Sequence, residues 1–217
     1  MPYRGHDAIE LNVGSTDQIC IRKLDRHLYC WEVDGDTNHH YTDPPPGLYK
    51  AVCSGAHTGC AITLDDSVVC WGITTDNASD YYDARPSSGN DPAVQITCGG
   101  QHVCIVTQTR SCPTCTLRFA CQGWNRDGQL ANTNIQARVW DNDVVKVSAG
   151  WSHTCVLRRN GNLDCYGVPG DDDHLGGVVQ FHAGSGHTMI LRSDGTAIGI
   201  GGFNNWSEND PYAPTCQ

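Results

Sequence analysis

Residues 152–167 read SHTCVLRRNGNLDCYG and carry two cysteines, Cys155 and Cys165, ten positions apart around an Asn-Gly pair. Short runs of alternating character on both sides of such a pair are typical of a β-hairpin, and Gly161 suits the left-handed position of a three-residue loop. An even separation places the two cysteines opposite each other, within reach of a disulfide. The stretch therefore predicts a hairpin that is closed by its own disulfide.

The same pattern recurs along the chain, because five segments combine a strand-like run with a following glycine. Four of the five carry a histidine four residues beyond a common alignment point. The alignment points are Val13, Cys53, Cys98, Ala149 and Ala183, and the residues four positions later are Asp17, His57, His102, His153 and His187. Such self-similarity indicates a repeat architecture. The repeats, approximately 8–47, 48–92, 93–143, 144–177 and 178–217, fill the chain, so we expect one domain over residues 1–217.

Cysteine pairs at comparable positions occupy four of the repeats. The hairpin disulfides expected from them join Cys20 to Cys30, Cys60 to Cys70, Cys155 to Cys165 and Cys104 to Cys121. The last pair has an odd separation, so we expect a β-bulge to absorb the change in register. The fifth repeat has Met189 and Gly199 at the two positions. Because both cysteines are absent together, the pattern favours paired cysteines over independent buried thiols.

Of the thirteen cysteines, five lie outside these pairs. Cys53 and Cys98 share the alignment point of neighbouring repeats, so we expect a bond between repeats two and three, with two buried thiols as the alternative. In the CPTC motif, a disulfide between Cys112 and Cys115 at a hairpin tip is favoured over a redox or zinc role, because redox motifs of this kind sit at a helix N-terminus. Cys216 is left over. We expect it to be capped, to link the protein to another chain, or to pair with a cysteine assigned elsewhere.

Composition and charge limit the classes to which the protein can belong. Thirteen cysteines and 24 glycines in 217 residues point to an oxidising compartment and to a fold of strands and turns. The net charge of −10 argues against a nucleic-acid partner. No apolar run approaches the ~18 residues of a membrane span, and the opening MPYRGHDAIE lacks the apolar core of a signal peptide. We therefore expect a secreted, extracellular protein in its mature form, with an added Met.

Two motifs resemble a known family. The pattern AG-x-x-HT-x-x-L-x-x-DG, followed by Trp-Gly or Tyr-Gly, resembles the regulator of chromosome condensation repeat, and GWNRDGQLANTN at 123–134 is similar to that family's G-x-N-x-x-GQL signature. The resemblance covers all five repeats and is weakest in the first. Cysteines within a hairpin, as in HTGCAITLDDSVVCWG at 57–72, are similar to those of the extracellular members, including the crinkly-type plant receptor ectodomains.

The resemblance implies an all-β fold, a β-propeller with one four-stranded blade per repeat. Family members usually carry seven blades, whereas this chain has five repeats. We expect the five blades to close into a ring, because an open arrangement leaves two long sheet edges unpaired.

The resemblance also implies a structural hydrogen bond for the repeated histidines. A shared metal site is disfavoured, because blade symmetry keeps these side chains apart. His39, His40 and the acidic run Asp171 to Asp173 with His174 lie in variable loops, where the spacing favours a solvated turn over a calcium site. No serine, histidine and carboxylate set stands outside the repeats, so we expect no catalytic residues, no enzymatic activity and no cofactor.

Unequal loops after the Trp-Gly corners are the candidate recognition elements. Their aromatic side chains suit this role, because aromatics anchor protein interfaces and also stack on sugars. The candidate binding residues are Tyr81, Tyr82, Trp140 and Trp206. The loops share little sequence, which favours an extracellular protein partner over the alternative, a lectin that binds a glycan at each blade. Guanine-nucleotide exchange, the activity of the nuclear family member, is disfavoured by the cysteine pairs and the acidic charge.

Two sequons predict glycosylation. Asn77 in NAS and Asn205 in NWS are acceptors for N-glycans if the protein is secreted by a eukaryotic cell.

Overall fold

The computed structural model describes residues 4–14, 18–32, 43–56, 58–72, 91–109, 116–130, 143–168 and 175–201. Within these ranges the chain forms fifteen β-strands and no helix, so the all-β prediction is confirmed. The strands make five antiparallel sheets of three strands, each in chain order.

The sheets follow the five repeats. Sheet 1 contains β1 (Ala8–Val13), β2 (Gln18–Lys23) and β3 (Leu28–Glu32), and sheet 2 contains β4 (Tyr49–Ser54), β5 (Thr58–Thr63) and β6 (Val68–Gly72). Sheet 3 contains β7 (Ala93–Cys98), β8 (His102–Gln108) and β9 (Leu117–Gly123), and sheet 4 contains β10 (Val144–Ala149), β11 (His153–Arg158) and β12 (Leu163–Gly167). Sheet 5 contains β13 (Val178–Ala183), β14 (His187–Arg192) and β15 (Ala197–Gly201).

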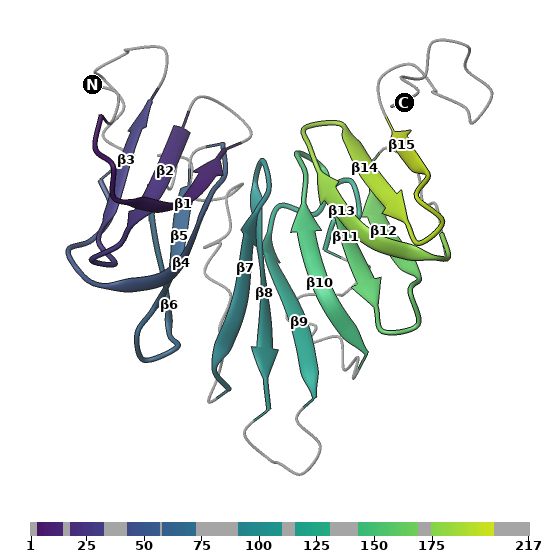
Figure 1. Cartoon of the computed structure of the whole chain (residues 1–217), viewed down its shortest axis with the longest axis horizontal. Helices are drawn as coiled ribbons and strands as arrows, with labels where there is room; N and C mark the ends of the chain where they lie inside the picture. Colours follow the sequence, from purple (N-terminus) through teal and green to yellow (C-terminus); the bar gives the residue numbers. More distant parts are fainter. Residues whose placement is uncertain are drawn as a thin grey trace.

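The sheets are arranged in chain order along an arc, from β1–β3 at one end to β13–β15 at the other (Figure 1). In the described residues, close packing joins each sheet only to the sheet before it and the sheet after it. The predicted closed ring is therefore wrong. The angle between neighbouring sheets is fixed by a close-packed layer of side chains, so five sheets cannot spread to fill a circle without opening those layers.

In the described residues each sheet has three strands and not the four that were predicted. A trace of the fourth strand exists beside sheet 4, where Leu175 forms an isolated antiparallel bridge with Leu163 of β12. In the described parts of the other repeats no strand occupies this position.

The hairpins follow the turn chemistry of the sequence. In sheet 4 the Arg158 N–H donates to the Asn162 carbonyl at 2.8 Å, and Gly161 adopts φ 83° in the loop between them. A side chain at that φ is strained, so Gly161 meets the left-handed position as predicted. Cys155 consequently lies directly opposite Cys165.

All four predicted hairpin disulfides are present: Cys20–Cys30, Cys60–Cys70, Cys104–Cys121 and Cys155–Cys165. In sheet 5, Met189 lies opposite Gly199, as the joint loss of the cysteines predicted. The bulge expected between Cys104 and Cys121 is wrong, because the β8–β9 register is continuous to Gln108 and Leu117. The odd separation is absorbed in the hairpin loop instead.

Bulges occur at another place, once in every sheet. The register between the first and second strands shifts one residue after the first strand begins, as at Ala8/Glu10 and Tyr49/Ala51. The shift recurs in sheets 3, 4 and 5 at Ala93/Gln95, Val144/Lys146 and Val178/Gln180. The bulged residues of these three sheets, Val94, Val145 and Val179, are all exposed. Their exposure is thus a property of the repeat and not of a particular sheet.

The predicted disulfide between repeats two and three, Cys53–Cys98, is also present. Its predicted basis was wrong, because the two cysteines do not occupy equivalent positions. Cys53 lies opposite Cys60, whereas Cys98 lies opposite Val103 and is equivalent to Ser54. Adjacent positions of a strand point to opposite faces. Cys53 therefore points forward from sheet 2 and Cys98 points back from sheet 3, so that they meet between the sheets.

The core is divided into four layers, one between each pair of successive sheets. Each layer joins the second and third strands of one sheet to the first strand of the next, as where Cys155 and Leu163 pack with Phe181. The position of Phe181 is filled by Val52, Ile96 and Val147 in sheets 2 to 4, and all four side chains are buried. Its equivalent in sheet 1, Leu11, is 66% exposed.

Candidate interaction surface

Polar side chains on the first strands connect the sheets near the middle of the arc. One position beside the apolar layer supplies an oxygen to the next sheet: Asn12 Oδ1 accepts from the Ser54 N–H at 2.7 Å. Thr97 Oγ1 and Ser148 Oγ accept in the same way, each at 3.1 Å, from Ala149 and Ala183. Cys53 occupies this position in sheet 2 and bonds covalently. At this position three of the four junctions are joined by a hydrogen bond and one by a disulfide.

A second polar position lies two residues earlier on the first strands of all sheets except sheet 2, where Ala51 takes this place. Gln95 donates from Nε2 to the Val147 carbonyl at 2.9 Å and accepts from the Val147 N–H at 3.3 Å. Lys146 donates to the Phe181 carbonyl at 3.0 Å and lies over the Phe181 ring, 5.3 Å from its centroid. Burial lowers the pKa of Lys146. These side chains satisfy the inner-strand backbone of the following sheet.

The repeated histidines are part of the same connections. His102 Nε2 lies 2.7 Å from Thr154 Oγ1 of the next sheet, and His153 Nε2 lies 2.9 Å from Thr188 Oγ1. Burial, with a smaller contribution from His153, lowers the pKa of His102 to about 3. Burial, with a smaller contribution from His187, lowers the pKa of His153 to about 4. Both imidazoles are neutral at physiological pH, and their hydrogen bonds are structural, as the resemblance implied.

The histidine alignment was wrong in the first two repeats. The strand position of His102, His153 and His187 is taken by Gln18 in sheet 1 and Thr58 in sheet 2. In all five sheets the carbonyl at this position accepts from the N–H of the glycine that begins the preceding turn. Asp17 and His57 precede that position and lie outside the described residues.

Glycines end the third strands of sheets 2 to 5 and direct the chain that leaves them. Gly72, Gly123, Gly167 and Gly201 have φ of 112°, 127°, 101° and 82°. A Cβ at Gly123 would lie 2.7 Å from the Cα of His102, so only glycine fits there. The following N–H groups anchor the chain to the turn between the first two strands, from Trp124 to Gln101 at 2.9 Å and from Val168 to Ser152 at 3.0 Å. The connections therefore start along one edge of the sheets, which we call the loop edge.

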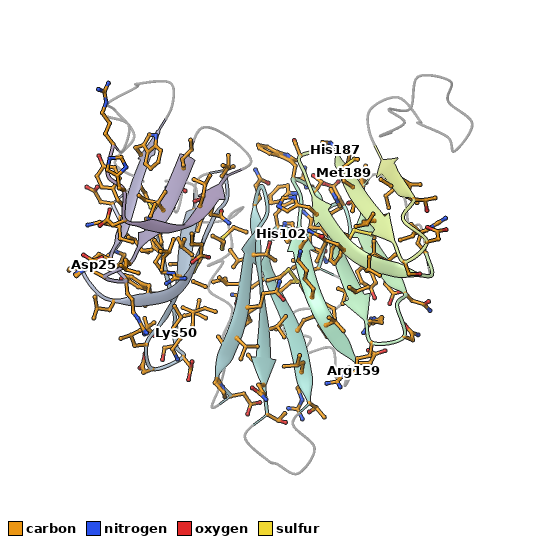
Figure 2. All side chains as sticks on the ribbon, in the orientation of Figure 1. Asp25, Lys50, His102, Arg159, His187 and Met189 are labelled. Carbon is orange, nitrogen blue, oxygen red and sulfur yellow. A yellow bond between two sulfur atoms is a disulfide. The ribbon has the colours of Figure 1, made fainter. Side chains whose placement is uncertain are left out.

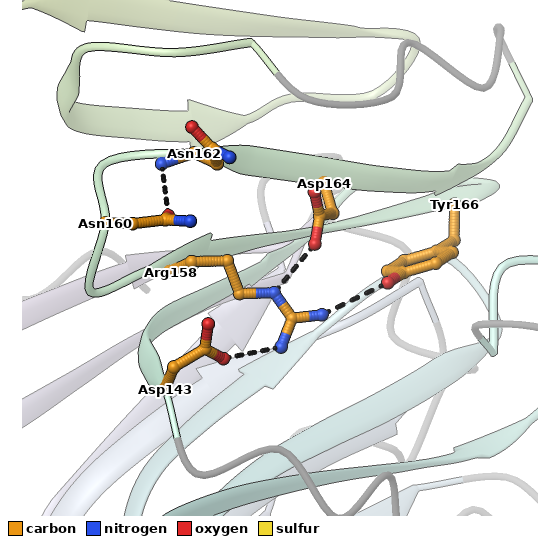
Figure 3. Close-up of polar contacts among 6 residues, drawn as sticks. All are labelled: Asp143, Arg158, Asn160, Asn162, Asp164 and Tyr166. Carbon is orange, nitrogen blue, oxygen red and sulfur yellow. Dashed lines mark hydrogen bonds and ion pairs between the residues drawn. The ribbon is translucent and has the colours of Figure 1, made fainter.

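A buried cation fixes the end of one such connection. The Arg158 guanidinium contacts Asp164 at 2.7 Å through Nε, Asp143 at 3.0 Å through Nη1 and the Tyr166 hydroxyl at 3.3 Å through Nη2 (Figure 3). Arg158 and Asp164 are both buried. Asp143 is the residue at which the chain rejoins sheet 4 after 131–142, so this cluster anchors the segment that carries Trp140.

Replacing Arg158 with lysine is expected to lower the free energy of unfolding by about 2 kcal/mol, because an ammonium cannot reproduce three contacts of a planar fork. Urea denaturation measures the change. The matched control is Arg159→Lys at the exposed neighbouring position, with an expected change below about 0.5 kcal/mol. Equal effects of the two substitutions would contradict a clamp at Arg158.

The comparison with known families gives a match within this part of the chain. Residues 144–172, which contain β10, β11 and β12, match the family model of the Regulator of chromosome condensation (RCC1) repeat. The fourth unit is therefore similar to an RCC1 repeat. A search of curated protein sequences gives no match.

Solved structures share the RCC1-like fold. The CRINKLY WD40 ectodomain of the Arabidopsis thaliana receptor kinase ACR4 aligns at 19% identity and TM-score 0.63, over 92% of this chain and 65% of that chain. Prp20p of Saccharomyces cerevisiae aligns at 15% identity and TM-score 0.68, over 91% and 57%. The ectodomain of the Physcomitrella patens receptor kinase CR4 aligns at 17% identity and TM-score 0.64, over 90% and 53%. The chain thus spans between half and two thirds of their lengths.

The sequence-predicted site residues lie on the connections of this RCC1-like fold, outside the described residues. They are the binding candidates Tyr81, Tyr82, Trp140 and Trp206, the glycan acceptors Asn77 and Asn205, and the cysteines Cys112, Cys115 and Cys216, together with His39, His40 and Asp171 to His174. The structure places only the strand ends from which their segments leave. These assignments stay predictions.

No group of three or more histidine, cysteine or acidic side chains in the described ranges is placed to hold a metal ion. Within the same ranges no helix has the length and apolar character needed to cross a membrane.

Sequence reasoning missed the polar side chains that join the sheets, and the Arg158 clamp. A signal for the first was present: polar residues alternate with apolar ones on the first strands, as in Gln95 and Thr97 beside Ile96. Such alternation normally indicates a solvated face. Here it marks the junction between two sheets.

Proposed function

We propose that the protein is a non-enzymatic, extracellular recognition module that binds a protein partner through the divergent segments of the loop edge. The observation that carries this proposal is the common origin of those segments: third strands of successive sheets end at glycines that turn the chain out along one edge. A rigid scaffold with variable loops at one edge is a common way to build a binding surface.

The five disulfides support the extracellular assignment. Disulfides persist in oxidising compartments, and the four hairpin bonds are too regular to be incidental. Two of the structural neighbours are receptor-kinase ectodomains, and a third, Prp20p, is a protein with binding properties toward Gsp1p and histones. These likenesses are consistent with an interaction module. The sequences of the loops determine which partner binds.

Binding is tested against a panel of purified secreted proteins and receptor ectodomains by surface plasmon resonance, beside a glycan array. For a partner found on the panel, the double change Tyr81→Ala with Tyr82→Ala is expected to weaken binding about 30-fold, the loss typical of an aromatic hot spot. The matched controls are Leu24→Ser and Leu64→Ser, two exposed apolar residues on hairpins at the opposite ends of the strands, which should change binding less than about twofold.

Two outcomes would contradict the proposal. Equal losses in the loop and hairpin variants would place the interface elsewhere. Binding on the glycan array alone, without a protein partner, would favour the lectin alternative.

A further inference from the structure

The end of the arc at sheet 5 carries an apolar face that the other sheets bury. Met189 is 45% exposed, although the equivalent cysteines of sheets 1 to 4 are buried completely. Leu191 is 38% exposed, although its equivalent in sheet 4, Leu157, is buried. Figure 2 shows Met189 and His187 together on this last sheet. The nearby exposed Val179 does not distinguish sheet 5, because the bulged valine is exposed in sheets 3 and 4 as well.

The polar positions that join sheets elsewhere are also present on this face. Gln180 is equivalent to Gln95, and His182 is equivalent to Ser148, each by its pairing with the second strand. His187 is equivalent to His153. All three side chains are exposed and have no hydrogen-bond partner among the described residues. The face therefore has the groups of a sheet-to-sheet junction without the second sheet.

The junctions between sheets 3 and 4 and between sheets 4 and 5, which have a histidine at this position, define what such a face binds. Gln95 contacts the N–H and carbonyl of one inner-strand residue, Ser148 contacts the N–H of another, and His153 contacts a threonine hydroxyl that lies opposite that second residue. The occupant is therefore a first strand with free backbone groups on one side, backed by a second strand whose second residue is threonine. Sequences that begin the second strand with His-Thr, as in sheets 4 and 5, supply this threonine.

We propose that the outer face of sheet 5, formed by Gln180, His182, His187, Met189 and Leu191, is a docking site for a further RCC1-type blade of the His-Thr kind, carried by a partner polypeptide. The contact extends an established interface by one unit, since each of its groups has a counterpart in the junction between sheets 4 and 5. The site is separate from the loop edge and independent of the function proposed for it.

Sheet 1 of a second copy fits this face less well. Its first strand presents exposed Leu11 and Val13, which suit the apolar layer. However, the residue opposite Val13 is Ile19, at the position where sheets 4 and 5 have Thr154 and Thr188. His187 would then face an aliphatic side chain. The hydroxyl requirement selects a blade of the His-Thr kind over a head-to-tail dimer of this chain.

The test supplies such a blade. A second copy of residues 175–201 is joined after Gln217, with residues 202–217 as the connection and with leucine in place of the copied methionine, so that the original Met189 can be followed alone. The added sheet presents the same outer face as sheet 5, so the two proteins differ by one junction. Peroxide oxidation of Met189, followed by peptide mass spectrometry, is expected to slow at least tenfold in the extended protein.

Two controls make the test specific. Changing the copied Thr188→Val removes the hydroxyl that His187 requires and is expected to restore part of the oxidation rate. A second extension, with residues 143–201, brings a pair of sheets with an apolar layer of their own. Unchanged oxidation of Met189 in both extended proteins would overturn the proposal. A dimer of the parent chain in sedimentation, with Met189 already protected, would overturn it in favour of a second copy.

Discussion

Replacing both Cys53 and Cys98 with alanine is expected to lower the free energy of unfolding by about 4 kcal/mol. The bond closes a loop with a sequence separation of 45 residues, and the chain-entropy estimate for a loop of that size is about 4 kcal/mol. The hairpin bond Cys60–Cys70 closes a separation of 10 residues, for which the same estimate is about 3 kcal/mol. Urea denaturation of the two double variants measures both losses.

A matched variant separates the covalent bond from the packing around it. Cys53→Thr with Cys98→Ala copies the residues of the next junction, where Thr97 accepts from the Ala149 N–H. This variant is expected to recover about 1 kcal/mol relative to the double alanine variant, the contribution of one hydrogen bond. A loss in the double alanine variant no greater than that of the hairpin variant would contradict the role assigned to the bond between sheets.

Acidification from pH 7 to pH 5 is expected to lower the free energy of unfolding by about 4 kcal/mol, half of it through His102 and half through His153. The pKa values are lowered to about 3 and about 4 in the folded protein, whereas an unfolded histidine titrates near 6.5. The unfolded chain therefore binds protons first. The stabilisation is complete above pH 6.5 and is lost progressively as the pH falls toward the folded values.

The pH window distinguishes the histidines from the carboxylates. The pKa values of Asp25, Asp65 and Asp194 are lowered from 3.8, so these groups keep their charge between pH 7 and pH 5. His102→Gln should halve the dependence of stability on pH in this window, whatever its effect at pH 7. Urea denaturation at several pH values provides the measurement. An unchanged slope in the variant would show that His102 is not a source of the dependence.

The hairpins and their disulfides could be predicted because they are local. The Asn-Gly turn and the ten-residue spacing of Cys155 and Cys165 specify register within one repeat. Relations between repeats were harder. The first turn has the same length in repeats two and three, with Gly55, Ala56 and His57 before Thr58 and with Gly99, Gly100 and Gln101 before His102. An alignment on the histidines placed repeat two one residue out of register, and so Cys53 and His57 were each assigned to a wrong position.

Closure of the ring could not be predicted for a related reason. The angle between two sheets depends on side chains from both of them, such as the pair Lys146 and Phe181 or the layer around Phe119 and Val147. No single repeat contains that information. For the loop residues, sequence and structure give different information. Trp140 was selected by its chemistry alone, and the structure describes only the Arg158 clamp at the point where its segment rejoins sheet 4.

The restriction of packing to successive sheets makes this molecule a one-dimensional array, in which stability is a sum over sheets and nearest-neighbour junctions. The end sheets each have one junction, so they open first, and unfolding propagates inward. The only covalent junction in the described residues, Cys53–Cys98, joins the second and third sheets and interrupts that propagation from the N-terminal side. Reduction of one bond would therefore convert a chain with a protected interior into one that unravels from both ends.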